Sequence, residues 1–171
     1  YLADEVLERQ PEATRDFLLR TAILDRLTGA LCDAVTAGTG GSATLVSLER
    51  ANLFLVPLDD QRRWYRYHHL FADLLRTRLL DQHPDDVAEI HRRASAWWEA
   101  HGETAEAIGH ALAAGDVDHA AGLIEGEALA LLRYRQEGTL RRWLDALPDH
   151  VFDVRPVLAD AHAGCLLVTG R

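Results

Sequence analysis

Short runs of apolar residues at helical spacing fill the first third of the chain. Pro11 separates the first two runs, because proline cannot continue a helix and restricts the residue before it. The second run carries Phe17 and Leu24 on one face and is interrupted by Thr28 and Gly29. The pattern predicts four short helices, at residues 2–9, 11–27, 28–36 and 42–52.

A glycine-rich segment, AGTGGSAT at residues 37–44, separates the third and fourth of these helices. Ser42 is expected to cap the fourth helix, because a serine hydroxyl can accept a hydrogen bond from an early helical N–H group. A phosphate-binding loop would continue into a lysine, and no lysine follows here. The segment is therefore interpreted as a flexible connector.

The spacing of apolar residues changes after the fourth helix. The apolar run LFLVPL is followed by the turn-like DDQRR and by the alternating aromatic run WYRY, which ends at Tyr67. Together these runs predict a β-hairpin, with Pro57 placing the first strand at an edge. A further helix follows, with Leu70, Phe71, Leu74, Leu75 and Leu79 on one stripe. Several short helices followed by a hairpin is the order of a winged helix.

Beyond residue 83 the pattern is purely helical. Apolar stripes predict five successive helices, with these positions inside: Val87, Ile90, Ala94, Trp97 and Trp98; Ala105, Ile108 and Leu112; Val117, Ala120, Ala121, Ile124, Ala128 and Leu131; Leu140, Trp143, Leu144 and Leu147; Leu158, Ala161, Cys165 and Val168. Helix starts near 86, 117 and 156 recur at roughly 30–40 residues, as in stacked helical hairpins. The array is expected to be unfinished at the turn-like VTGR that ends the chain.

The composition of the chain excludes several classes of protein function. The formal charge is −9, and all 18 basic residues are arginine, which argues against a nucleic-acid-binding surface and against lysine chemistry. Cys32 and Cys165 form no CxxC pair, so neither a disulfide framework nor a zinc knuckle is expected. We expect the protein to work in a reducing cytoplasm. A chain that begins with Tyr1 and has no methionine is expected to be a piece of a longer polypeptide. No signal peptide or membrane span is expected.

Three stretches carry a family resemblance: RDFLLRTAILDRLTGALCDAVT, LERANLFLVPLDDQRRWYRYHHLFADLLR and AIGHALAAGDVDHAAGLIE. They resemble the region after the nucleotide-binding core in MalT-like, LuxR-type transcriptional regulators, which are signal-transduction ATPases. The resemblance implies a mainly α fold, with a winged-helix-like arm domain at 1–82 and the start of a tetratricopeptide-like repeat array at 83–171.

The resemblance also implies the surroundings of this region. An ATPase domain that uses ATP or ADP, with magnesium, is expected upstream, and further sensor repeats are expected downstream. A small-molecule inducer or a protein effector would act on the sensor. DNA is expected to be bound only through a domain outside this fragment, which itself would hold no cofactor.

His68 and His69 stand where the hairpin meets the next helix. Adjacent residues of a helix face different directions, so a metal site formed by this pair alone is not expected, although His69 and Asp73 have i, i+4 spacing. General-base catalysis by either histidine is not expected, because the sequence shows no nucleophile motif or second titrating group near them. One histidine capping or packing at the corner is the first interpretation. The resemblance adds a second, in which His68 or His69 touches the phosphate of a bound nucleotide.

The same corner holds the one basic cluster of the sequence: Arg62, Arg63, Arg66, Arg76 and Arg78. Asp59, Asp60, Asp73 and Asp81 alternate with it, so surface ion pairs are expected. The alternative is an inter-domain contact made by Arg62, Arg63, Trp64, Tyr65, Arg66 and Tyr67, because arginine and aromatic side chains are enriched at protein interfaces.

A non-catalytic regulatory role follows, in which this region couples an ATPase switch to a helical-repeat sensor and a distant DNA-binding domain. Two alternatives stay open: a stand-alone helical-repeat scaffold for protein partners, and a winged helix that binds DNA directly. The second is weaker, because residues 42–51 offer only Arg50 for reading bases.

Overall fold

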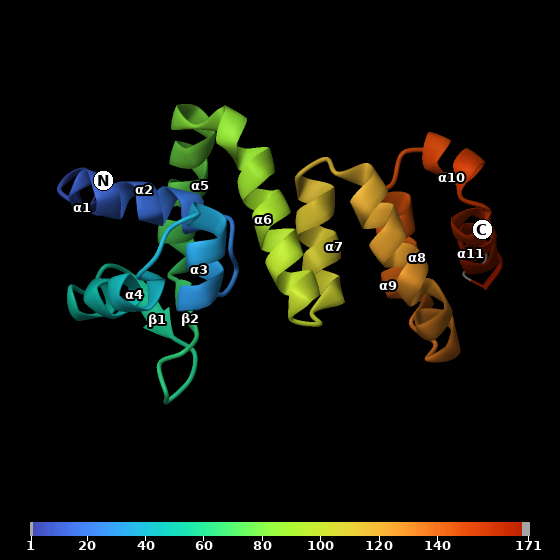
Figure 1. The fold of residues 1–171 in the computed structure, drawn as a ribbon, viewed down its shortest axis with the longest axis horizontal. Helices are drawn as coiled ribbons and strands as arrows, with labels where there is room; N and C mark the ends of the chain where they lie inside the picture. The colour runs from blue at the N-terminus through green and yellow to red at the C-terminus, as the bar shows by residue number, and fades with distance from the viewer. Residues whose placement is uncertain (1, 169–171) are drawn as a thin grey trace. The chain divides into compact units, whose positions relative to one another are not determined.

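A computed structural model describes residues 2–168, and these residues form mainly α-helices and one β-hairpin (Figure 1). The elements are α1 (Leu2–Glu8), α2 (Glu12–Thr21), α3 (Gly29–Thr36), α4 (Gly41–Arg50), β1 (Leu55–Pro57), β2 (Tyr65–Tyr67), α5 (His69–Gln82), the 3-10 turn η1 (Pro84–Asp86), α6 (Val87–Ala100), α7 (Thr104–Ala113), α8 (Val117–Arg133), α9 (Glu137–Asp145), α10 (His150–Val154) and α11 (Pro156–Val168). The mainly α class predicted from the sequence is confirmed.

The chain divides into two compact units, Tyr1–Trp97 (unit 1) and Trp98–Arg171 (unit 2). Unit 1 contains α1 to α5 and the hairpin, and α6 continues from it into unit 2. The domain boundary that the sequence predicts at residue 82 stays a prediction. The turn expected at the end of the chain falls on residues 169–171, which lie outside the described part.

Helix α2 ends at Thr21, earlier than the sequence pattern predicts. The reason is a tertiary contact of the segment after it. The backbone of Leu27 pairs with that of Tyr65, with N–H to carbonyl distances of 2.7 and 2.8 Å in the two directions. Because Leu27 gives its backbone to the hairpin, the chain cannot stay helical up to Thr28.

Helix α4 begins at Gly41, and its N-cap residue is Gly40 in the left-handed region at φ 81°. The prediction of Ser42 as the cap is therefore wrong, since Ser42 already lies inside the helix. A more distant side chain replaces it: the Gly41 N–H donates to Oδ1 of Asp33 at 2.7 Å. The start of α4 is thus held by a carboxylate from α3.

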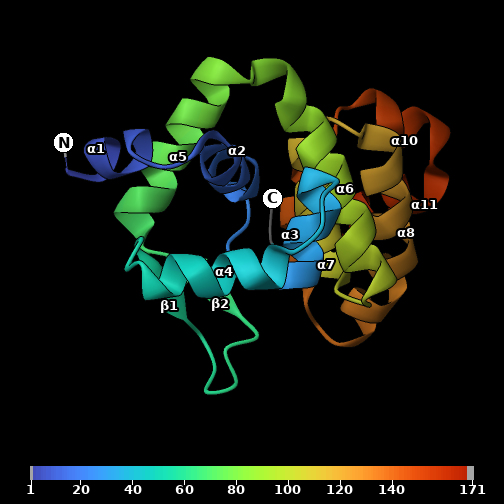
Figure 2. The same ribbon diagram turned by 60° about the vertical axis from the view of Figure 1, so that its left-hand side comes forward.

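The hairpin is antiparallel and pairs Leu55 with Tyr67 and Pro57 with Tyr65. Its loop extends away from the helices of unit 1 (Figure 2). Strand β2 lies between β1 and Leu27, so β1 is at the edge, as Pro57 predicts. The hairpin expected from the sequence is confirmed.

Helix α5 buries Phe71, Ala72, Leu75 and Leu79 against unit 1. Leu70 was expected on the same stripe, but its side chain is 65% exposed. Each residue turns by about 100° around a helix, so Leu70 lies on the flank of the face centred on Phe71 and Leu75.

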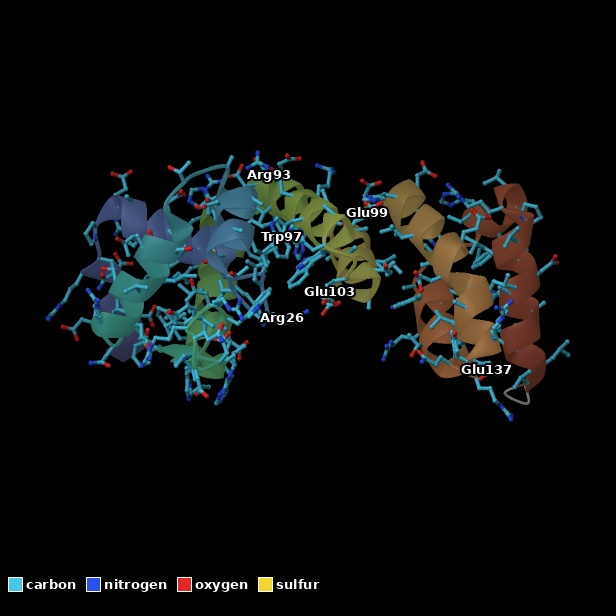
Figure 3. All side chains as sticks on the ribbon, turned by 60° about the horizontal axis from the view of Figure 1, so that its bottom comes forward. Arg26, Arg93, Trp97, Glu99, Glu103 and Glu137 are labelled. Atoms are coloured by element: carbon cyan, nitrogen blue, oxygen red, sulfur yellow. The ribbon has the colours of Figure 1, made fainter. Side chains whose placement is uncertain are left out.

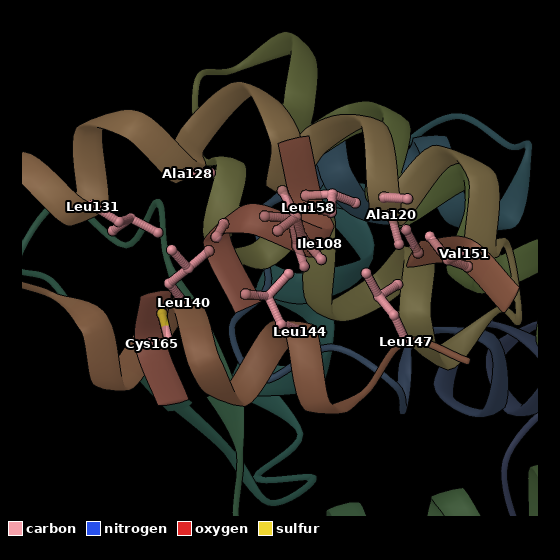
Figure 4. Close-up of a cluster of buried hydrophobic side chains, with 14 residues drawn as sticks. Ile108, Ala120, Ala128, Leu131, Leu140, Leu144, Leu147, Val151, Leu158 and Cys165 are labelled. Atoms are coloured by element: carbon pink, nitrogen blue, oxygen red, sulfur yellow. The ribbon is translucent and has the colours of Figure 1, made fainter. Parts of the chain in front are cut away.

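In residues 98–168, unit 2 is built from helices alone, and its core is a cluster of small and branched apolar side chains (Figure 4). The cluster contains most of the positions predicted beyond residue 98: Ile108, Ala120, Ala121, Ile124, Ala128, Leu131, Leu140, Leu144, Leu147, Leu158, Ala161 and Cys165. Ala105 and Val168 were expected inside but are exposed. Helix α10 was not predicted, because its five residues are too few to show a period.

Candidate functional site: the hairpin-to-helix corner

The corner between β2 and α5 is fixed by backbone hydrogen bonds of His68. Its N–H donates to the carbonyl of Phe54 at 2.7 Å, and its carbonyl accepts from the N–H groups of Phe71 and Ala72, both at 2.9 Å. His68 is the N-cap residue of α5, but its side chain makes no capping hydrogen bond. The backbone alone therefore sets the direction in which the helix leaves the hairpin.

Both histidine side chains of the corner are exposed. Neither imidazole packs in the core. Of the interpretation that one histidine caps or packs at the corner, the packing part is therefore wrong, whereas His68 does occupy the N-cap position, through its backbone. The two rings lie together, with centroids 4.4 Å apart and planes inclined by 32°. The prediction that the two side chains face different directions assumes that both residues lie in the helix. His68 instead lies just before α5 with an extended backbone, so its ring can lie beside that of His69.

The paired imidazoles do not belong to a larger set of metal ligands in residues 2–168. No group of three or more histidine, cysteine, aspartate or glutamate side chains in this part of the chain is arranged to hold a metal ion. What the pair offers is two adjacent polar rings that solvent, or another protein surface, can reach.

Strand alternation sorts the aromatic and basic residues of β2 into two faces. Tyr65 and Tyr67 point inward and are 1% and 4% exposed, whereas Arg66 between them is exposed. Both tyrosines are core residues, whereas the sequence places them in a possible inter-domain contact. We call Arg66, His68 and His69 the corner surface.

Buried polar contacts hold the two tyrosines. The hydroxyl of Tyr67 lies 2.7 Å from Oγ1 of Thr21, and that of Tyr65 donates to Glu49 at 3.3 Å. Burial is the largest cause that raises the pKa of both phenols, so both stay neutral at neutral pH. The inward face of β2 is thus anchored in the core of unit 1 and supports the exposed face.

The arginines near the corner do not form one cluster. Arg62 pairs with Glu49 at 2.7 Å, Arg76 with Asp25 at 3.0 Å, and Arg78 with Asp4 at 2.9 Å. These partners come from distant segments. Within residues 2–168, Asp73 is the one expected aspartate that forms an ion pair, with Arg76 at 3.8 Å, while Asp60 and Asp81 act on Arg62 and Arg78 only through their charge. Asp59 instead accepts from the backbone N–H of Arg63 at 2.8 Å. Arg62, Arg76 and Arg78 are therefore ion-paired, mostly not with the predicted partners, whereas Arg63 and Arg66 are exposed.

An arginine that the sequence did not single out joins the aromatic residues of unit 1. The guanidinium of Arg26 lies over the ring of Trp64, 4.9 Å from its centroid, and Trp64 meets Trp97 edge to face at 6.4 Å. Figure 3 labels Arg26 and Trp97. Trp64 is half-buried, so its indole packs within unit 1. Nothing local in the sequence marks Arg26, because its aromatic partner is far away along the chain.

The other tryptophans occupy the positions expected of core residues. Trp98 is buried, and Trp143 is half-buried against the core of unit 2.

In the described part of the chain, no helix is long and apolar enough to cross a membrane.

Comparison with known proteins places these features in a family. Residues 3–87 match the model of the MalT winged helix domain. The HTH-type transcriptional regulator MalT of Klebsiella pneumoniae strain 342 is 40% identical over 148 residues, which is 86% of this chain and 16% of that protein. The MalT of strain MGH 78578 of the same species gives the same values. The chain thus spans about 16% of the length of these relatives.

Proposed function

Because this chain is a region of a MalT-like transcriptional regulator and carries the MalT winged helix domain at residues 3–87, we propose that it is a non-catalytic coupling segment. It joins an ATPase switch domain on one side to a helical-repeat sensor on the other. DNA is bound by a different domain of the parent protein, which works in the cytoplasm. ATP or ADP, with magnesium, belongs to the ATPase domain.

The corner surface is the observation that carries this proposal. Its backbone is fixed by three hydrogen bonds, while the side chains of Arg66, His68 and His69 are exposed. Imidazole and guanidinium groups both donate hydrogen bonds to phosphate oxygens. A rigid support with exposed donors suits a contact that forms in one state of a switch and breaks in another.

The contact is proposed for the exposed residues of the corner and its loop, which are Arg62, Arg63, Arg66, His68 and His69. Tyr65 and Tyr67 are buried and support this contact surface from inside unit 1. Trp64 is half-buried, so only part of its side chain is available to the contact. A nucleotide held by the ATPase domain would meet an imidazole of this surface. Movement of the winged helix would then depend on which nucleotide is bound.

Unit 2 supports the sensor half of the proposal. Helix α8 packs against α7 and α9, and α11 packs against both α8 and α9. Short connections join these helices, and small side chains such as Ala120 and Ala121 line the seam between them. Tetratricopeptide-like repeats are built from such helical hairpins, and their surfaces bind small molecules or protein effectors.

The test uses the full-length parent regulator with His68→Ala, His69→Ala and the double substitution. We expect faster loss of bound ADP, or transcription without inducer, in at least one variant. His150→Ala is the matched control, because His150 is also exposed but lies in unit 2. If the double variant retains ADP and needs inducer for transcription as the control does, the nucleotide contact is refuted.

Direct DNA binding by the winged helix has less support. The outward side chains of α4 include Ser42, Ala43 and Ser47, and Arg50 is its only basic residue. Arg62 of the hairpin loop is paired with Glu49. Helix α4 therefore offers a single cation, although phosphate contacts supply most of the affinity for DNA.

A further inference from the structure

An apolar pocket of about 260 Å³ lies at the junction of α5 and α6 within unit 1. Its lining consists of Ile23, Arg76, Leu79, Leu80, Val87 and His91. Four of these six side chains are aliphatic. Leu79 is 1% exposed and Leu80 is 58% exposed, so the pocket runs from the core of unit 1 to its surface.

Arg76 is held firmly at the wall of this pocket. Its Nε donates to the carbonyl of Ala22 at 2.8 Å, and Nη2 donates to Asp25 at 3.0 Å. Nη1 lies 3.8 Å from Asp73, which is too long for a hydrogen bond. A guanidinium has five N–H donors, so donors are left for a further acceptor.

The two aspartates near Arg76 do not neutralise it strongly. The side chains of Asp25 and Asp73 are 97% and 70% exposed. Ion pairs in such solvated positions are weak, because water screens them. The Arg76 side chain is itself 40% exposed, so an incoming carboxylate can reach it and add to its partners or replace one of them.

His91 provides the second polar group of the lining. Burial, followed by the charge of Arg76, lowers the pKa of its imidazole from the ordinary value. The ring is consequently neutral at neutral pH, and it adds no second full charge to the pocket.

We propose that this pocket binds a small amphiphilic monocarboxylate, with its hydrocarbon chain against Ile23, Leu79 and Val87 and its carboxylate on Arg76. The apolar walls favour a hydrocarbon chain, and the planar guanidinium matches the geometry of a carboxylate. The volume is below that of typical drug-sized sites, which selects a short chain. This proposal does not depend on the nucleotide contact at the corner surface.

Binding there would have a conformational consequence. The pocket takes its walls from α5 and α6, which η1 connects at Pro84–Asp86. Residues 3–87 form the winged helix domain, so α6 begins where that domain ends. A ligand that touches both helices fixes the direction of α6 as it leaves the winged helix.

The first experiment titrates three six-carbon probes into the 171-residue chain: hexanoate, 1-hexanol and hexylammonium. Binding is followed by the NMR signals of the His91 ring. We expect saturable shifts, with hexanoate binding about tenfold more tightly than hexanol because a charge-assisted hydrogen bond is added. Hexylammonium should bind most weakly. The absence of saturable shifts, or hexylammonium binding as tightly as hexanoate, overturns the proposal.

Variants then test the residues. Arg76→Gln should weaken hexanoate binding about tenfold and leave hexanol binding unchanged, which also shows that the pocket is still folded. Arg78→Gln is the matched control, because it removes an ion pair from the same helix outside the pocket. Val87→Phe should fill the pocket and abolish binding of both probes, with circular dichroism confirming the fold. Equal losses in Arg76→Gln and Arg78→Gln, or full binding in Val87→Phe, refute the site.

Discussion

At the scale of single residues, the inward face of β2 shows how a buried polar pair can specify a core. Thr21 donates to the carbonyl of Phe17 at 2.8 Å, and its Oγ1 lies 2.7 Å from the hydroxyl of Tyr67. Thr21 is completely buried and Tyr67 nearly so. A hydroxyl buried without a partner costs more than the hydrogen bond contributes, so the Tyr67 hydroxyl requires Thr21, whereas Thr21 also has the Phe17 carbonyl.

Tyr67→Phe tests this pair. Thr21 keeps its bond to Phe17, so we expect the free energy of unfolding to fall by only about 1 kcal/mol. Thr21→Val should cost more, about 1–3 kcal/mol, because it leaves the Tyr67 hydroxyl without its partner. Urea unfolding of the two single variants and the double variant gives the coupling energy. Tyr134→Phe is the control, since Tyr134 is 72% exposed. Additive losses in the double variant would contradict the pairing.

At the scale of elements, α3 and α4 approach closely because both begin with glycine. A Cβ added to Gly29 would lie 1.9 Å from Oγ and 2.6 Å from the backbone nitrogen of Ser42. A Cβ on Gly41 would lie 2.6 Å from the carbonyl oxygen of Gly29. The two helix starts can therefore touch only without side chains.

Gly29→Ala should force α3 and α4 apart and destabilise unit 1 by about 1–3 kcal/mol, as overpacking does. Gly109→Ala is the matched control, because Gly109 lies within α7 and its added Cβ meets nothing within 4 Å. That change should stabilise α7 by about 0.5–1 kcal/mol. Hydrogen exchange measured peptide by peptide separates the two effects. Unchanged exchange in α3 and α4 of Gly29→Ala would show that the close approach is not needed.

At the scale of the whole molecule, the two compact units have separate cores. Unit 1 is packed around large side chains such as Tyr65, Phe71 and Leu18, whereas the core of unit 2 is rich in alanine. Alanine permits close packing of neighbouring helices. Helix α8 contacts both α7 and α9, and α11 contacts α8, α9 and α10. The stability of unit 2 should therefore depend on its few large residues.

Leu144→Ala tests this dependence. Leu144 is completely buried in the core cluster of unit 2 (Figure 4), and we expect a loss of about 2–5 kcal/mol through the cavity that remains. Hydrogen exchange should accelerate first in α8, α9 and α11. Leu129→Ala should change little, because Leu129 is 71% exposed. A uniform acceleration that includes α2 to α5 would mean that both units unfold together.

The purified 171-residue chain should not hydrolyse ATP. A phosphate-binding loop requires a lysine, and the 18 basic residues of the chain are all arginine. Phosphate release should match the buffer background in a colorimetric assay. Turnover that disappears after a point substitution within the chain would refute this expectation.

The sequence by itself determined the order and type of most elements. Apolar residues recur every three to four positions in α6 to α9 and α11, and alternate in the hairpin, because each element must bury one face. Gly102 and Gly115, both at positive φ, mark turns between helices that the pattern also separates. The family resemblance rests on the same local runs. These features depend on residues close together in the sequence, so the spacing of apolar residues is enough to reveal them.

Tertiary structure decided everything that depends on distant partners. Leu27 is not helical because its backbone pairs with Tyr65, and the first N–H of α4 is bound by Asp33 rather than capped by Ser42. Tyr65 and Tyr67 of β2 are buried, so Arg66 between them points outward. The corner is fixed by hydrogen bonds of the His68 backbone, in which the imidazole takes no part. Exposure of His68 and His69, and the meeting of Arg76 with α6 around a pocket, follow from contacts across tens of residues. No local pattern encodes such contacts, because they form only when separate elements pack.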